Sequence, residues 1–212
     1  DDTAPTDHPP AVAALLDAAT EPDPERISAI LDEVLAGASY EAVIDDILLA
    51  SLAEAGRAWR AGRLSVTGEH LLSAAIHRRL GQLFEAAGRD PARAEVLIGT
   101  PPDSHHDLGA LAFAVAARRA GLAIWYLGTG LPAADWSAAV RRHRPRWVVL
   151  TVHHTRDLAA LGAVVAELRH PEHGDPQVTI GVGGNLQNRA PSGTVPLGHR
   201  VTEAARHLAG SP

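Results

Sequence analysis

The 212-residue sequence contains no cysteine and no methionine, and only 4% of its residues are aromatic. Without cysteine, disulfides, zinc–thiolate sites, iron–sulfur clusters and thiol catalysis are all excluded. The core must be built from Ala, Leu, Val and Ile, because aromatic side chains are scarce. Without methionine, we expect that residue 1 is not the natural start. A processed start and a missing upstream domain both stay open.

Long apolar runs and an excess of basic residues are also lacking. No stretch approaches the ~20 apolar residues of a membrane span, and the polar start "DDTAPTDHPP" is no signal peptide. We therefore expect a soluble, cytoplasmic protein without membrane contact. The formal charge of −6 argues against nucleic-acid contact by this chain itself.

Residues 1–90 have the pattern of four helices joined by short turns, which favours an antiparallel four-helix bundle. The four helices are expected at 9–20, 23–38, 39–62 and 65–88. Asp23 before Pro24 is a helix start, Ser39 is a cap, and either Ser65 or Thr67 caps the last helix. Residues 88–93 are the expected linker.

Residues 91–212 alternate short β-rich runs with helical segments, which predicts a doubly wound, flavodoxin-like parallel sheet covered on both faces. The strands are expected within 94–100, 122–128, 146–152 and 177–184. The predicted fold class is thus a helical bundle followed by a Rossmann-like α/β domain. Ligands of such sheets bind at the carboxyl ends of the strands.

The loop after the first predicted strand, "TPPDSHHDLG", carries His105 and His106 just before a helix. A neutral imidazole on a stiff loop is a good axial ligand for a transition metal in a macrocycle. Read by itself, a histidine in such a loop is more often a cap or a surface residue.

Three segments together resemble the cobalamin-binding fold, whose signature Asp/Glu-x-His-x-x-Gly follows the first strand. His106 and Gly109 match its His-x-x-Gly core, Thr151–His153 stand where the family has Ser-x-Leu, and Gly183–Gly184 match its Gly-Gly. The resemblance implies that His106 binds cobalt from below. It also implies that the displaced nucleotide tail of the cofactor passes Thr151 and the two glycines, whose missing Cβ atoms leave room for it.

Two positions depart from this family pattern. Ser104 stands where the family has an acid that holds the ligand imidazole. The flanking Asp103 and Asp107 are candidates to replace that acid. His153 takes the position of the leucine, so a polar ring enters an apolar place.

The stretch "AWRAGRLSVTGEH" places Trp59 in the last turn of one predicted helix and Glu69–His70 in the first turn of the next. Trp59 as a core residue and Glu69 as a partner of the helix dipole are the plain alternatives. The spacing Trp-x9-Glu-His resembles the CarH-type photoreceptors. That resemblance implies that these residues cover the upper face of adenosylcobalamin and that light drives a shift of the bundle.

In that family a histidine can follow the tryptophan and cap cobalt in the light. Arg60 takes this position, and arginine has no lone pair to give. His70 and water are the remaining candidates.

Other functions stay open at this stage. His105, His153 and His154 would suit a second tetrapyrrole, a bilin such as biliverdin, as in stand-alone relatives of the photoreceptors. A corrinoid carrier of a methyltransferase system is another alternative, and the small subunit of an adenosylcobalamin mutase ranks last. We expect no catalytic residues, because no nucleophile–base pair stands out and such a cofactor carries its own chemistry. A homo-oligomer stays open.

Overall fold

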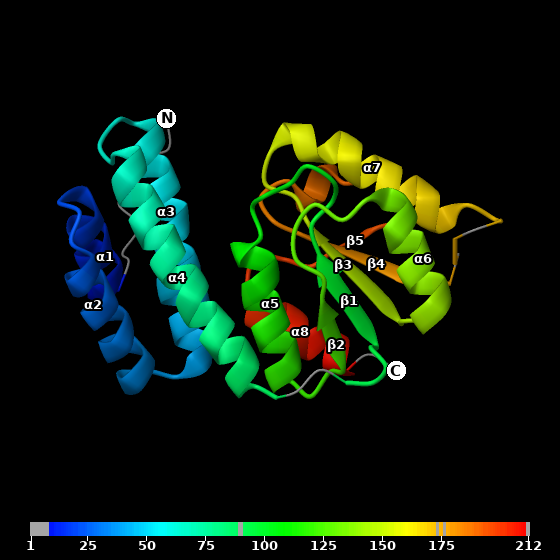
Figure 1. Ribbon diagram of the computed structural model, residues 1–212, viewed down its shortest axis with the longest axis horizontal. Helices are drawn as coiled ribbons and strands as arrows, with labels where there is room; N and C mark the ends of the chain where they lie inside the picture. Colours follow the sequence, from blue (N-terminus) through cyan, green and yellow to red (C-terminus); the bar gives the residue numbers. More distant parts are fainter. Residues whose placement is uncertain (1–8, 89–90, 173, 176, 211–212) are drawn as a thin grey trace. The chain divides into compact units, whose positions relative to one another are not determined.

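The computed structural model describes residues 9–88, 91–172, 174–175 and 177–210, and the chain forms two compact units, Asp1–Gln82 and Leu83–Pro212 (Figure 1). The first unit is helical and the second is built around a sheet. No helix in the described ranges is both long and apolar enough to cross a membrane.

The first unit contains α1 (Pro10–Thr20), α2 (Pro24–Gly37), α3 (Leu49–Arg60) and all but the last turn of α4 (Val66–Ala86), which confirms the predicted four-helix bundle. Asp23 caps α2 by accepting a hydrogen bond from the Arg26 N–H at 2.9 Å. Ser65, not Thr67, caps α4, since its hydroxyl accepts from the Gly68 N–H at 3.1 Å. The core is aliphatic, as the composition requires. Its fully buried members include Leu15, Ile27, Leu31, Ile44, Leu48, Leu72, Ile76 and Leu80.

A π-helix, η1 (Ala42–Leu48), leads into α3, where the sequence predicts one unbroken α-helix. The N–H of Leu49 donates to the carbonyl of Ile44, one residue further back than in an α-helix. Four apolar side chains of η1 are buried, so the wider turn places its apolar residues in the core: Val43, Ile44, Ile47 and Leu48. The apolar pattern is compatible with both helix types, which is why the sequence does not reveal the difference.

The sheet of the second unit has five parallel strands in the order β2-β1-β3-β4-β5. They are β1 (Val96–Gly99), β2 (Ile124–Tyr126), β3 (Trp147–Thr151), β4 (Thr179–Gly183) and β5 (Val195–Pro196). The first four confirm the predicted strands. The sequence does not reveal β5, because this strand has only two residues, both exposed, and one of them is a proline at the edge of the sheet.

Two pairs of helices pack together in this unit, as Figure 1 shows. One pair is α5 (Leu108–Arg119) with α8 (Val201–Gly210), and the other is α6 (Ala133–His143) with α7 (Thr155–Arg169). The second pair shares a core with the strands, in which Trp136 and Leu161 are fully buried. A short 3-10 turn, η2 (Gln187–Arg189), follows β4. The doubly wound α/β domain is therefore confirmed.

Candidate functional site

The carboxyl ends of β1, β3 and β4 meet at one edge of the sheet. Gly99 pairs with Leu150, and Thr151 pairs with Gly183. The loops that follow these strands therefore begin side by side. Every predicted site residue of this unit, from Ser104 to Gly184, lies on or next to these loops.

The loop between β1 and α5 is fixed from within by Thr100. The Thr100 hydroxyl donates to the Ser104 carbonyl at 2.8 Å and accepts from the Gly130 N–H at 2.9 Å. Asp103 adopts a left-handed backbone conformation with φ of 60°. As a result Ser104 is buried, whereas His105 and His106 are exposed.

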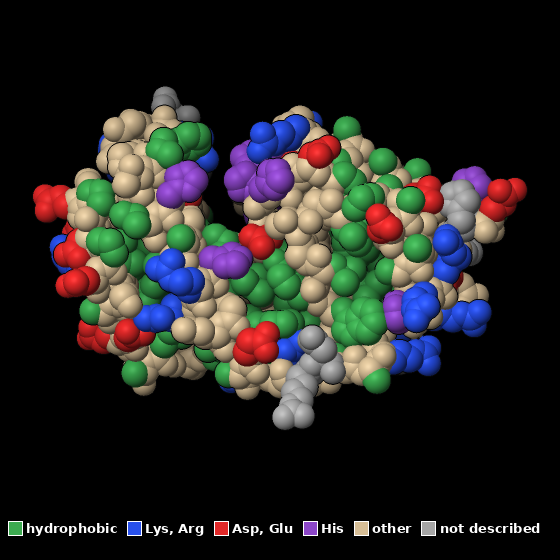
Figure 2. Space-filling view, viewed as in Figure 1, with side chains coloured by type: hydrophobic (Ala, Val, Ile, Leu, Met, Phe, Trp, Pro, Cys, Tyr) green, Lys and Arg blue, Asp and Glu red, His purple; other side chains and the backbone are tan. Residues whose placement is uncertain are grey.

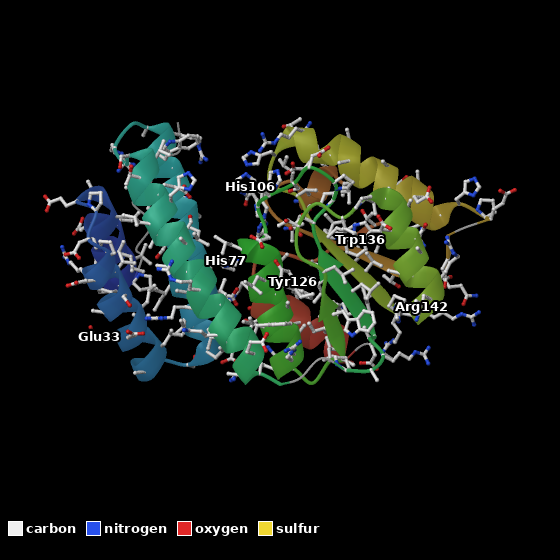
Figure 3. The ribbon with its side chains drawn as sticks, viewed as in Figure 1. Glu33, His77, His106, Tyr126, Trp136 and Arg142 are labelled. Carbon is white, nitrogen blue, oxygen red and sulfur yellow. The ribbon has the colours of Figure 1, made fainter. Side chains whose placement is uncertain are left out.

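Three imidazoles gather at this edge. Nε2 of His106 lies 3.0 Å from Nε2 of His154, and the ring of His153 lies 6.4 Å from that of His106 between centroids. Figure 2 shows histidine side chains grouped on this part of the surface, and Figure 3 labels His106 there. Burial lowers the pKa of His153, and the neighbouring His106 and His154 lower it further. The environment therefore favours the neutral form of the His153 ring.

Gly109 explains how a histidine fits where the family pattern has leucine. A Cβ atom on Gly109 would lie 3.4 Å from Nε2 of His153. The glycine of the His-x-x-Gly core thus gives the His153 ring its place beside α5.

Asp107, a candidate to replace the missing acid, accepts a hydrogen bond from the hydroxyl of Tyr126 at 2.7 Å. Tyr126 ends β2, the neighbour of β1 in the sheet. This bond ties the residue after His106 to the adjacent strand. Tyr126 could not be found from the sequence, because nothing in its spacing links it to the loop.

Two buried hydroxyls lie in the same region, Ser104 Oγ and Thr151 Oγ1. Within the described part of the chain, neither has a hydrogen-bond partner. A buried polar atom without a partner costs about 1–3 kcal/mol, so each hydroxyl needs a partner, which a water molecule or a bound polar ligand can supply. Both positions fit a cofactor whose tail carries phosphate, hydroxyl and ring nitrogen atoms.

The two glycines after β4 differ in their surroundings. Gly184 has φ of +94°, and a Cβ there would overlap the backbone of Val152. Its missing side chain therefore serves the packing of the chain itself, which corrects the expectation that both glycines leave room for a ligand. A Cβ on Gly183 would meet only Thr151 Cγ2, at 3.7 Å. Room for a tail beside Gly183 stays a prediction.

The corner between α3 and α4 presents the other three predicted residues. Gly62, with φ of +70°, ends the turn, and the Gly62 N–H donates to the Trp59 carbonyl at 2.9 Å. Trp59 is 49% exposed, so it is not a core residue. Glu69 accepts a hydrogen bond from Ser73 Oγ at 2.6 Å, and His70 is exposed one residue further along. An indole, an oriented carboxylate and an imidazole thus belong to one end of the bundle.

Known families and proteins match both units. Residues 11–84 and residues 94–201 each match a family model described as a B12 binding domain. The chain is 34% identical over 147 residues to the HTH-type transcriptional repressor CarH of Myxococcus xanthus. The matched segment covers 69% of this chain and 49% of that protein. It is 29% identical over 184 residues to the repressor CarA of the same organism, covering 87% and 61%. The chain thus spans between about half and three fifths of these relatives.

A solved structure shares the fold. The monomethylamine corrinoid protein of Methanosarcina barkeri superposes with a TM-score of 0.75 at 16% identity, over 92% of this chain and 95% of that one. At 16% identity this superposition shows only that the fold is shared. The indication of a B12 ligand comes from the family models. Because the matched B12-binding models cover both units, the chain belongs to the B12-binding domain family.

Proposed function

We propose that the chain is a cobalamin-dependent light sensor in which His106 is the lower axial ligand of cobalt. The observation that carries this proposal is the place of His106, on a fixed loop at the carboxyl edge of the sheet beside two buried hydroxyls. A single imidazole is sufficient as the protein's ligand, because the macrocycle would supply the equatorial ligands. Thr151 and Ser104 would then bind polar atoms of the buried tail, which satisfies their hydroxyls.

The upper face of the cofactor is proposed to meet Trp59, Glu69 and His70. Bound adenosylcobalamin supplies a cobalt–carbon bond that visible light breaks. Trp59 offers a half-exposed indole surface, and Ser73 orients the Glu69 carboxylate. Arg60 can take no part as a ligand, since a guanidinium has no free lone pair. This pattern, together with the likeness to CarH and CarA, favours a sensor over a carrier.

Illumination separates a sensor from a corrinoid carrier, the alternative that shares this fold. The protein is loaded with adenosylcobalamin in the dark, exposed to green light and compared with a dark sample by absorption and light scattering. We expect both the spectrum and the oligomeric state to change. A change of spectrum without any change of assembly or of bundle conformation would favour the carrier.

The substitution His106→Ala tests the ligand assignment. Without the imidazole, we expect the histidine-bound cobalamin spectrum to disappear and the affinity to fall at least about tenfold. His170→Ala is the matched control, because His170 is the C-cap residue of α7, at the opposite end of that helix from His154. An unchanged spectrum in His106→Ala would remove His106 as the ligand.

The bilin alternative gains no support from the relatives named above, and it stays a prediction. An absorption spectrum after incubation with biliverdin tests it directly. A red-shifted bilin band that is lost in His105→Ala or His153→Ala would support it.

A further inference from the structure

The imidazole proposed to bind cobalt is in contact with a second imidazole. Nε2 of His106, on the loop before α5, lies 3.0 Å from Nε2 of His154, the N-cap residue of α7. The ring centroids are 4.4 Å apart and the planes are inclined by 55°. This is hydrogen-bond geometry between two ring nitrogens.

In this pair His106 Nε2 is committed whichever tautomer is present. A neutral imidazole has one N–H and one nitrogen with a lone pair. If His106 Nε2 accepts from His154, its lone pair is in use. If His106 Nε2 donates, it carries a proton and has no lone pair in the ring plane. In both cases the same nitrogen cannot bind cobalt at the same time.

The backbone of His154 is held in place independently of His106. The backbone N–H groups of His153 and His154 donate to Oδ2 of Asp157, at 3.3 and 3.0 Å. Asp157 is buried in the first turn of α7, with an exposed fraction of 2%. The position of the His154 backbone is therefore set by the start of the helix, and its exposed ring is not placed by burial.

We infer that His154 competes with cobalt for Nε2 of His106 and thereby sets how tightly the protein holds cobalamin through that histidine. This inference rests on the proposed function, because it takes His106 as the lower ligand. Cobalamin binding exchanges the imidazole–imidazole hydrogen bond for the cobalt bond. The lost hydrogen bond lowers the affinity by about three- to tenfold relative to a protein that never forms it.

The test uses His154→Phe, which keeps an aromatic ring without ring nitrogens, and His154→Ala. His170→Ala, at the other end of the same helix, is the control. Each full-length protein is titrated with cobalamin by absorption, beside the wild type and His106→Ala. We expect both His154 variants to bind about three- to tenfold more tightly and to keep the histidine-bound spectrum, while the control stays at the wild-type affinity. Equal or weaker binding in both variants overturns the competition.

A second readout does not require cobalamin. The 15N chemical shifts of the His106 ring are compared between wild type and His154→Phe before any cobalamin is added. A shift of the Nε2 signal is expected, because its hydrogen-bond partner is removed, and an unchanged signal overturns the inference.

Failure of the proposed function and failure of the competition are distinguishable. If the wild type binds no cobalamin, the proposed function and the competition both fail. If His106→Ala loses the histidine-bound spectrum but the His154 variants match the wild type, only the competition fails.

Discussion

Tyr126 shows how a single hydroxyl couples the ligand loop to the sheet. Its hydrogen bond to Asp107 joins the end of β2 to the residue after His106, and its ring packs edge-on against Phe84 with centroids 6.0 Å apart. Burial raises the pKa of Tyr126 far above its ordinary value of 10, and the adjacent Asp107 carboxylate raises it further. The folded protein therefore holds this phenol in its neutral form.

The consequence for stability has a definite sign. A phenol whose pKa is raised on folding contributes stability below its unfolded pKa, near 10, and loses that contribution as the pH rises above it. We expect the absorbance of the Tyr126 phenolate at 295 nm to appear only together with unfolding. The Tyr126 signal is obtained as the difference between wild type and Tyr126→Phe, and circular dichroism reports unfolding. Ionisation of Tyr126 in the folded protein near pH 10 would contradict the expectation.

At the level of single residues, the motif spacing predicts which residues lie near the carboxyl ends of the strands but not how their side chains pair. Thr151 and Gly183 end two strands that the hydrophobic pattern predicts, and His106 lies in the loop after another. The resemblance to the cobalamin-binding fold is what singles these residues out. The contact of His106 with His154 joins residues 48 positions apart, and it depends on β3 lying next to β1. The predicted flavodoxin-like fold already implies that order, but it does not fix the course of the loop after β1 or the orientations of the rings, so these side-chain pairs could not be derived from the sequence.

Among the helices, α4 contains two glycines with opposite surroundings. A Cβ on Gly68 would overlap the carbonyl of Ala19 in α1, whereas a Cβ on Gly81 would have nothing within 4 Å. Gly68 therefore allows a close approach of two helices, and Gly81 has no such role.

We expect Gly68→Ala to lower the free energy of unfolding by about 1–3 kcal/mol, because the helices must separate. Gly81→Ala, the matched control in the same helix, should raise it by up to about 1 kcal/mol, since alanine is the better helix former. Urea denaturation followed by circular dichroism measures both. Equal effects of the two substitutions would show that α1 and α4 are not in close contact at Gly68.

The helices and the four longer strands follow from local patterns of apolar residues and caps. Besides the short turn η2, two elements do not follow from these patterns, η1 and β5, and their local sequences fit more than one structure. An apolar stripe suits a π-helix as well as an α-helix over seven residues. The strand Val195–Pro196 exists only because the edge of β4 offers a partner.

For the whole chain, the division into two units suggests a division of tasks. The proposed cobalt ligand belongs to the second unit, and Trp59 belongs to the first. We expect Trp59→Ala to retain the histidine-bound cobalamin spectrum, because His106 and the buried hydroxyls are unchanged. The light-dependent change of assembly should be lost or reduced, since the proposed contact with the upper face is removed.

The measurement is light scattering of the adenosylcobalamin-loaded variant in the dark and after green light. Val66→Ala is the control, because Val66 is a second exposed apolar residue, 55% exposed, at the same corner. A Trp59→Ala protein that responds to light like the wild type would show that the indole takes no part in the response.

The π-helix also bears on the history of the chain. Its i→i+5 hydrogen bond closes around one more residue than an α-helical turn does. An ancestral α-helix that gained one residue between Ser39 and Leu49 could absorb it in this wider turn without rotating α3. Relatives with an unbroken helix here should therefore show a single-residue gap when aligned with residues 42–48, while their counterpart of Trp59 stays in register. The π-helix η1 would then result from an insertion that left the turn between α3 and α4 unchanged.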